Sequence, residues 1–325
     1  MGKDFEKSNI LNQFKKLNIR LNQKSWSSRN TYRKSTQRIL KYCYENYNIQ
    51  KIENVQNKHI RAYVEAQDDK SLSTLKKEIA GFRFYINTLN NLNISRDRKE
   101  CKFNLTNKEL GIGGKKEFNQ RTAPTIEEFN NIIDKIKEVR DENTRDTLLY
   151  GTYMGAYLGL RSKEIFSVKK SQLRNCIESM GENKKVHLKL DGEGCKGGRP
   201  REIGPLSEKQ QQIVLEIYEK ACRKKYVDDY VLRERNIPHS LQSRLSLWHN
   251  FYSRIGYDVA SKERRNRPEY DNHLSAHSLR RFFAVNLYKK LRRDMSHEKA
   301  FSKVAENLGH GANRFELAKH YLGEL

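Results

Sequence analysis

Apolar side chains recur at the three- and four-residue spacing of an amphipathic helix through most of the first third of the chain. All five prolines lie at or after Pro124, so the strongest helix breaker is absent from this part. The pattern predicts a helix that follows a cap at residues 27–30 and runs to Cys43, a second over Val55–Val64, and a third from residues 71–74 to Leu89. We therefore predict a helical N-terminal domain over residues 1–112.

The composition changes over residues 113–123, where glycine, lysine and other polar residues predominate, and such a segment predicts a linker. Directly after it, Thr125 precedes two glutamates and an apolar helical pattern, which indicates the capped first turn of a new helix. Residues 124–325 are therefore predicted to form a second domain. Its apolar stretch Leu148–Leu160 carries glycines at several positions, which favours a tightly packed helix over a membrane span.

Residues 184–206 follow a two-residue period instead. Apolar and polar side chains alternate over Val186–Leu190, turn residues fill Gly192–Gly198, and a second short strand resumes at Arg201, which predicts a β-hairpin. Helical periodicity returns at Ser207 and again at Ser278, with a break near residues 294–296. Residues 264–268 are expected to form a basic loop, and residues 223–244 show no clear pattern. The expected fold class is thus mainly α with a small β-hairpin (α+β).

The charge of the chain is strongly positive. Its 325 residues include 64 Lys and Arg against 40 Asp and Glu, for a formal net charge of +24, and the basic residues are spread along the whole length. This distribution favours a folded surface that binds a polyanion, with a solvated basic surface as the alternative. The five cysteines lack metal-ligand spacing, and neither a signal peptide nor a membrane-spanning run is evident, so a reduced, cytoplasmic protein is expected.

Candidate chemistry gathers toward the C-terminal end. His277 and Arg280 are spaced to share one helix face, where both can reach a single anion, and His310 and Tyr321 follow. Cationic groups neutralise the charge that builds on a phosphate oxygen, and a phenol among them can form a covalent intermediate. The combination predicts phosphodiester cleavage by a tyrosine nucleophile. No tight carboxylate pair accompanies the histidines, which disfavours a metal-dependent nuclease.

Four segments resemble the signature of the tyrosine recombinase (phage integrase) family, namely Gly159–Ile165, residues 275–284, Leu308–His310 and the region around Tyr321. The resemblance implies that Arg161 and Arg280 clamp the scissile phosphate and that Glu164 supports their pocket. It implies that His277 hydrogen-bonds the phosphate or acts as a base toward the tyrosine, and that His310 donates to a nonbridging oxygen. Tyr321 would be the nucleophile, although the step from His310 to Tyr321 is longer than is usual in the family.

The predicted hairpin turn, Cys195–Arg201, looks like the family's mobile β-hairpin, whose lysine protonates the departing 5′ oxygen. We assign this role to Lys196, with Lys189, Arg199 and Arg201 as competitors, because a flexible stem on a glycine-rich turn gives an ammonium the reach of a general acid. Arg281 is expected to face DNA or solvent. The residues expected to contact DNA are Lys76, Lys77, Arg83, Arg199, Arg201 and Arg281.

As a whole, the resemblance implies a site-specific DNA recombinase or integrase that breaks and rejoins DNA through a 3′-phosphotyrosyl intermediate, without metal, ATP or another cofactor. It implies integration or excision of a mobile genetic element as the biological role, with chromosome-dimer resolution as the alternative. The implied architecture is a C-shaped clamp of two domains, a helical core-binding (SAM-like) domain and a catalytic domain. The implied partners are double-stranded recombination sites, a homotetramer of two dimers on DNA and an accessory directionality factor, with no membrane, in the nucleoid-associated part of a bacterial cytoplasm.

The sequence is compatible with two alternative functions. The same chemistry would serve a type IB topoisomerase-like enzyme that relaxes DNA as a monomer. A different class is a noncatalytic, basic DNA-binding protein that retains a recombinase scaffold. The complete set of matching residues argues against such a degenerate binder, and this set comprises Arg161, Lys196, His277, Arg280, His310 and Tyr321.

Overall fold

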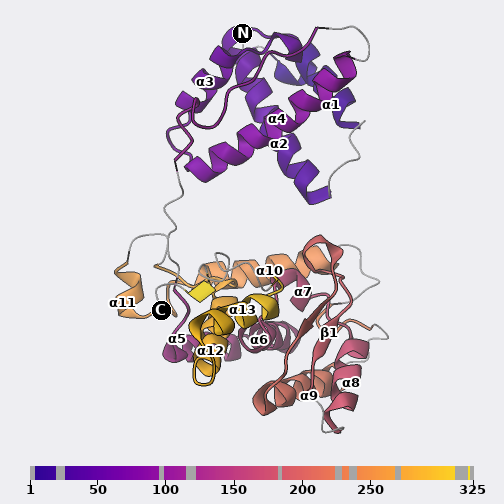
Figure 1. Cartoon of the computed structure of the whole chain (residues 1–325), viewed down its shortest axis with the longest axis vertical. Helices are drawn as coiled ribbons and strands as arrows, with labels where there is room; N and C mark the ends of the chain where they lie inside the picture. The colour runs from indigo at the N-terminus through magenta and orange to yellow at the C-terminus, as the bar shows by residue number, and fades with distance from the viewer. Residues whose placement is uncertain are drawn as a thin grey trace. The chain divides into compact units, whose positions relative to one another are not determined.

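The structure is a computed structural model of the chain that describes residues 4–19, 26–94, 99–114, 122–181, 185–223, 229–233, 240–267, 272–311 and 321–322. Helices dominate these ranges, and one two-stranded antiparallel sheet accompanies them (Figure 1). The predicted fold class, mainly α with a small hairpin, is confirmed. The chain divides into two compact units, Met1–Glu117 and Phe118–Leu325. Residues 115–121 of the predicted linker lie outside the described ranges.

The first unit is built on helix α2, which packs against α1, α3 and α4 (Figure 1). Its inner side chains form one apolar core, because each helix presents a stripe of large residues at helical spacing. The three predicted helices are present, and α2 begins slightly earlier than expected. Helix α1 was not predicted. The helices of this unit, with 3₁₀ helices marked η, are η1 Phe5–Lys7, α1 Asn9–Ile19, α2 Trp26–Tyr47, η2 Ile52–Asn54, α3 Asn57–Glu65 and α4 Leu72–Ile94.

The second unit is built around helices α6 and α12, which pack against each other. Helix α12 also packs against α13 (Figure 1). Gly151 on α6 lets Trp248 of α10 pack directly on the helix, since a Cβ there would lie 2.6 Å from the indole ring. The predicted break near residues 294–296 is confirmed, because α12 ends before it and α13 begins after it. The helices are α5 Ile126–Lys137, α6 Glu142–Tyr157, α7 Ser162–Ile165, α8 Lys170–Glu178, η3 Ser179–Gly181, η4 Lys196–Gly198, α9 Glu208–Arg223, α10 Ser240–Ile255, α11 Lys262–Arg265, α12 Ser278–Leu291 and α13 His297–Asn307.

The predicted hairpin is present as strands β1 (Leu188–Leu190) and β2 (Arg201–Ile203). Leu188 pairs with Ile203 and Leu190 with Arg201, which places these four side chains on the inner face of the hairpin. The turn between the strands carries η4 and Lys196. Within the described ranges, no helix combines the length and apolarity needed to span a bilayer.

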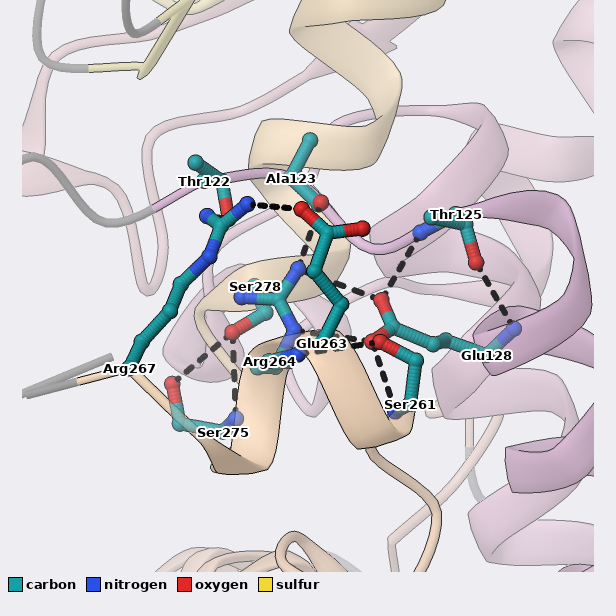
Figure 2. Close-up of polar contacts among 10 residues, drawn as sticks. All are labelled: Thr122, Ala123, Thr125, Glu128, Ser261, Glu263, Arg264, Arg267, Ser275 and Ser278. Carbon is teal, nitrogen blue, oxygen red and sulfur yellow. Dashed lines mark hydrogen bonds and ion pairs between the residues drawn. The ribbon is translucent and has the colours of Figure 1, made fainter. Parts of the chain in front are cut away.

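A buried ion pair joins the start of α5 to α11. The prediction of a basic loop over residues 264–268 is wrong for residues 264 and 265, which are helical. Arg264 lies on α11 and donates from Nε to Glu128 Oε1 at 2.9 Å and from Nη2 to Glu128 Oε2 at 3.1 Å (Figure 2). Glu128 also accepts from the backbone N–H groups of Thr125 and Ser261. Burial alone would raise the pKa of Glu128, but these hydrogen bonds outweigh it and hold the pKa below its ordinary value.

The ion pair between Glu128 and Arg264 is expected to stabilise the second unit. Glu128→Ala should destabilise the second unit by about 3–5 kcal/mol, because it leaves the Arg264 guanidinium buried without its carboxylate. Glu127→Ala is the matched control, since Glu127 is its exposed neighbour on the same turn and should change stability by less than about 0.5 kcal/mol. Thermal unfolding followed by calorimetry measures both variants. Equal transitions for the two variants would show that the ion pair contributes nothing to the stability of the unit.

Candidate active site

The first predicted phosphate clamp, Arg161, stands at the junction of α6 and α7. Gly159 ends α6 with a φ of +63° and permits a close approach of Phe283, whose ring would lie 2.4 Å from a Cβ at this position. The Arg161 backbone N–H then donates to Glu164 Oε2 at 2.7 Å, and its Nη1 donates to Glu164 Oε1 at 2.7 Å. Because Glu164 holds both the backbone and the guanidinium of Arg161, the orientation of the side chain is fixed.

The second predicted clamp, Arg280, lies on the first turn of α12 and is almost completely buried. Its Nη1 donates to the carbonyl of Gly159 and its Nη2 to the carbonyl of Leu308. Arg161 Nη2 donates to the same Leu308 carbonyl at 3.0 Å. The two guanidinium groups therefore meet at the C-terminal end of α13, although 119 positions separate them in the sequence (280 − 161).

The predicted nucleophile, Tyr321, is ringed by three of the other predicted residues. The ring centroids of His277 and His310 each lie 5.4 Å from the centroid of Tyr321, and the Arg280 guanidinium carbon lies 5.4 Å from that centroid. Tyr321 and Leu322 are helical and pack into an apolar cluster formed by α12 and α13. Residues 312–320, which hold most of the predicted nucleophile segment, lie outside the described ranges.

His310 follows the end of α13 and is half-buried. Burial, together with the charges of Arg280 and Arg161, lowers its pKa to about 4, so the ring is neutral at pH 7 when the pocket holds no anion. Its Nε2 has no hydrogen-bond partner among the described residues. A phosphate placed beside these groups would supply both an acceptor and a negative charge, and the negative charge would raise the pKa again.

Glu164 and Arg201 form the buried foundation of the pocket. Glu164 accepts from Arg161 and also from Arg201 Nη2 at 2.8 Å, and its side chain is fully buried. Burial raises the pKa of Glu164, but the charges of Arg201, Arg280 and Arg161 outweigh burial and hold the pKa below its ordinary value. One carboxylate thus faces three guanidinium groups, which leaves the pocket with excess positive charge.

Two further nitrogen atoms of the pocket are buried without a partner in the part of the chain that the structure describes. They are Arg280 Nε and Arg201 Nε. A buried donor that forms no hydrogen bond carries a desolvation cost of about 1–3 kcal/mol, which an anion with several acceptor oxygens can remove. Excess positive charge and unpaired donors both fit a site for phosphate. No group of three or more His, Cys, Asp and Glu that could hold a metal ion occurs among the described residues.

Lys196 lies outside the ring around Tyr321, on the exposed turn between β1 and β2. Its positive charge is one of the smaller causes of the lowered pKa of His310. Of its three competitors, Lys189 and Arg199 are exposed, whereas Arg201 is buried in the pocket. The structure therefore brings Arg161, Glu164, Arg280, His277, His310 and Tyr321 together and leaves Lys196 on a neighbouring turn.

The residues predicted to contact DNA differ in exposure and in hydrogen bonding. Lys77 and Arg199 are exposed, while Lys76 Nζ donates to the carbonyl of Gly114 at 2.5 Å. Arg83 donates to Leu105 and Asn107 within the first unit. Arg281 was expected to face DNA or solvent but is buried, because α6 and α13 both pack against α12.

The placement of Arg201 was also missed. Its Nη1 donates to the carbonyl of Asn307 at 2.5 Å, and its Nη2 reaches Glu164, so the side chain joins β2 to α13 and α7. The alternation of side chains along the strand could have predicted this burial. Arg201 shares a face with the apolar Ile203 and must point inward when Ile203 does. Arg201 is thus a structural partner of the predicted phosphate clamps.

No protein-family model matches the chain, and no curated protein matches it in sequence. Solved structures match it over nearly its full length. XerH site-specific recombinase, bound to a palindromic difH substrate in a post-cleavage complex, is 19% identical, with 95% of this chain and 80% of that chain covered and a TM-score of 0.61. The Tn1549 transposon integrase in complex with circular intermediate DNA is 13% identical, with 98% and 96% covered and a TM-score of 0.58.

A dimer of lambda integrase bound to a core site is 14% identical, with 97% of this chain and 95% of that chain covered and a TM-score of 0.56. The chain has the tyrosine recombinase fold. Lambda integrase has also been solved as a tetramer bound to a Holliday junction, at 14% identity and a TM-score of 0.55. At these identities the likeness shows the fold alone.

Proposed function

We propose that the chain is a site-specific tyrosine recombinase that cleaves and rejoins double-stranded DNA through a 3′-phosphotyrosyl intermediate. The observation that carries the proposal is the surrounding of Tyr321 by His277, His310 and Arg280, each 5.4 Å from its ring. A phosphate held by these cations and by Arg161 would lie beside the phenol that attacks it. The recombinase fold agrees with this chemistry.

The reaction conserves the energy of the phosphodiester. Tyr321 Oη attacks phosphorus, the bond from phosphorus to the 5′ oxygen breaks, and the DNA is left with a 3′-phosphotyrosyl link and a free 5′ hydroxyl. Arg161 and Arg280 would balance the charge that builds on the nonbridging oxygens, and His310 would donate to one of them. His277 would hydrogen-bond the phosphate or accept the tyrosine proton. Attack by a 5′ hydroxyl of the partner strand reverses these steps and rejoins the DNA.

Lys196 completes the proposed chemistry as the general acid for the departing 5′ oxygen. An alkoxide is a poor leaving group, so a proton must reach it as the bond breaks. The exposed turn between β1 and β2 gives the ammonium freedom to approach the oxygen, and a Cβ added to Gly197 or Gly198 beside it would meet no other group within 4 Å. Protonation of the leaving oxygen and deprotonation of Tyr321 keep the net proton count unchanged.

We further propose the assembly in which this chemistry serves recombination. Residues 1–112 would be the core-binding domain, residues 113–123 the linker and residues 124–325 the catalytic domain, with both domains contacting the duplex. Four copies on two sites would exchange strands in two successive pairs. The biological role would be integration or excision of a mobile genetic element in a bacterial cytoplasm, with an accessory directionality factor as a partner. The net charge of +24 supports DNA as the ligand.

The DNA site is obtained first by covalent capture. A pool of duplexes with a randomised central segment is incubated with the protein, and DNA that stays attached in hot detergent is sequenced. A duplex with the captured site and a nick beside the mapped cut, called the nicked duplex below, then traps the adduct because the short released strand diffuses away. Covalent DNA in the absence of metal and ATP is expected. The absence of any adduct would contradict the proposed function.

Strand exchange distinguishes a recombinase from a topoisomerase-like enzyme. Two duplexes of different length that both carry the captured site should give recombinant products and four-way junctions, because the 5′ hydroxyl of one duplex can attack the adduct of the other. Gel analysis of the products measures both species. A supercoiled plasmid that lacks the site should stay supercoiled. Relaxation of that plasmid without exchange between the duplexes would contradict the recombinase and support the topoisomerase-like alternative.

A further inference from the structure

The turn that carries Lys196 is fixed at its base by two acidic residues, Asp191 and Glu193. Asp191 Oδ2 lies 2.6 Å from Lys169 Nζ, and its Oδ1 accepts from the backbone N–H of Glu193 at 3.0 Å. Glu193 Oε2 lies 3.4 Å from the same Lys169 ammonium. Lys169 immediately precedes α8, so this contact ties the turn to a helix.

Glu193 is held more strongly by the segment 229–233. Tyr230 Oη donates to Glu193 Oε1 at 2.6 Å, and Arg233 forms an ion pair with the same carboxylate. The Arg233 guanidinium also stacks over the Tyr230 ring, with its carbon 3.7 Å from the ring centroid. Burial raises the pKa of Glu193, but the hydrogen bond from Tyr230 and the charge of Arg233 outweigh it, so the carboxylate is ionised at neutral pH.

This segment is itself anchored to the protein. The N–H of Val231 donates to the carbonyl of Val168 at 3.0 Å, and the N–H of Lys170 donates to the carbonyl of Asp229 at 2.5 Å. The Asp229 carboxylate accepts from the hydroxyl of Ser171 at 2.6 Å. Tyr230 and Arg233 therefore present a fixed surface to Glu193.

The next residue, Gly194, packs against α7, the short helix that follows Arg161. A Cβ on Gly194 would lie 2.6 Å from the carbonyl of Lys163 and 2.6 Å from Ser167 Oγ, so the turn lies directly on this helix. On the other side of the turn, Arg201 is buried against Glu164. Both ends of the turn are thus in contact with the protein, and Glu193 lies between them and the exposed residues Lys196–Arg199.

We propose that Glu193, through its contacts with Tyr230 and Arg233, is a positioning residue that places the turn so that Lys196 reaches the departing 5′ oxygen. This inference rests on the proposed function, because it needs Lys196 to be the general acid. Glu193 acts through the turn and does not touch DNA or the reacting atoms. Loss of its anchor would let Lys196 sample positions too far from the oxygen, which lowers the rate of protonation without altering the phosphate pocket.

The test compares two leaving groups in the nicked duplex. One duplex has the ordinary 5′ oxygen at the scissile phosphate, and the other has sulfur at that position. A thiol with a pKa of about 8.5 leaves readily as a thiolate, so the sulfur duplex needs no general acid. Single-turnover rates of adduct formation are measured for the parent, Lys196→Ala, Glu193→Ala and Tyr230→Phe. Glu202→Gln is the matched control, because Glu202 is a carboxylate of the same hairpin that contacts His187 instead of the turn.

With the ordinary duplex, Lys196→Ala should be slower by about 100- to 10,000-fold and Glu193→Ala by about 10- to 100-fold. Tyr230→Phe should show a smaller loss, about 3- to 10-fold, since Arg233 still holds the carboxylate. With the sulfur duplex, all three variants should match the parent within about twofold. Glu202→Gln should match the parent on both duplexes.

Equal slowing of Glu193→Ala on both duplexes would overturn the inference, because a general loss of structure would affect either leaving group. A Glu193→Ala rate equal to that of the parent on the ordinary duplex would overturn the inference as well. Slowing of Lys196→Ala on both duplexes would remove the general acid on which it depends. If the parent forms no adduct with either duplex, the proposed function itself fails, and that outcome is separate from the other three.

Discussion

Tyr321→Phe is expected to form no covalent adduct with the nicked duplex while it still binds that duplex. The substitution removes only the phenolic oxygen, and the ring remains packed against Leu322, Phe283 and the rest of the apolar cluster. Without this oxygen no bond to phosphorus can form, so adduct formation should fall to background. DNA affinity should change by less than about threefold, because contacts to many phosphates sustain binding. Denaturing gels measure the adduct and a filter-binding titration measures affinity.

Tyr288→Phe is the matched control for this substitution. Tyr288 is a buried tyrosine of the same cluster, but its hydroxyl contacts His297 Nδ1 at 2.5 Å and is not ringed by the phosphate-clamp residues. It should form adduct at a rate close to that of the parent. Undiminished adduct in Tyr321→Phe would exclude Tyr321 as the nucleophile. Loss of adduct in both variants would instead indicate a packing effect.

Arg280→Lys should slow adduct formation by about 100- to 1,000-fold, the range found when one donor to a charged transition state is lost. The lysine keeps the positive charge but lacks the planar fork that lets Arg280 contact Gly159 and Leu308 and still present Nε to an anion. The effect should appear in the rate of the chemical step and not in DNA affinity. Rapid-quench kinetics at saturating DNA separate the two quantities.

The same exchange at Arg292 provides the control. Arg292 follows the last turn of α12 and lies far along the helix from the pocket, so Arg292→Lys should react like the parent. Circular dichroism and thermal unfolding establish that Arg280→Lys is folded. A folded Arg280→Lys protein with the parent rate would contradict the proposed contact between Arg280 and the phosphate.

Periodicity predicts much of the fold because each element buries its own apolar face. Helices α2, α3 and α4, the hairpin and the break before α13 follow from local patterns, and they are present. Helix α1 was missed, even though Ile10, Phe14 and Leu17 repeat at helical spacing and are buried. Arg264 could not be placed in the same way. Its burial depends on Glu128, which is 136 positions earlier, and no local pattern connects the two residues.

The candidate site shows the same difference between what local sequence predicts and what only tertiary packing determines. The residues of the pocket belong to segments whose resemblance to a known family is local, so the sequence predicts Arg161, Arg280 and Tyr321 as candidate site residues. Their convergence depends on the packing of α6, α7, α12 and α13, which only the structure supplies. Arg281 shows the limit of helical periodicity. It follows Arg280 on a helix that neighbours enclose on more than one side, so a position expected to be outward is buried.

The chemical identity of the trapped adduct tests most directly whether Tyr321 is the nucleophile. Nuclease treatment of the adduct leaves a short nucleotide remnant on the protein, and peptide mass spectrometry then locates it. The remnant is expected on Tyr321, attached through a 3′ phosphate, and the other DNA end is expected to carry a free 5′ hydroxyl. A remnant on any other residue, or a link through a 5′ phosphate, would contradict the proposed role of Tyr321.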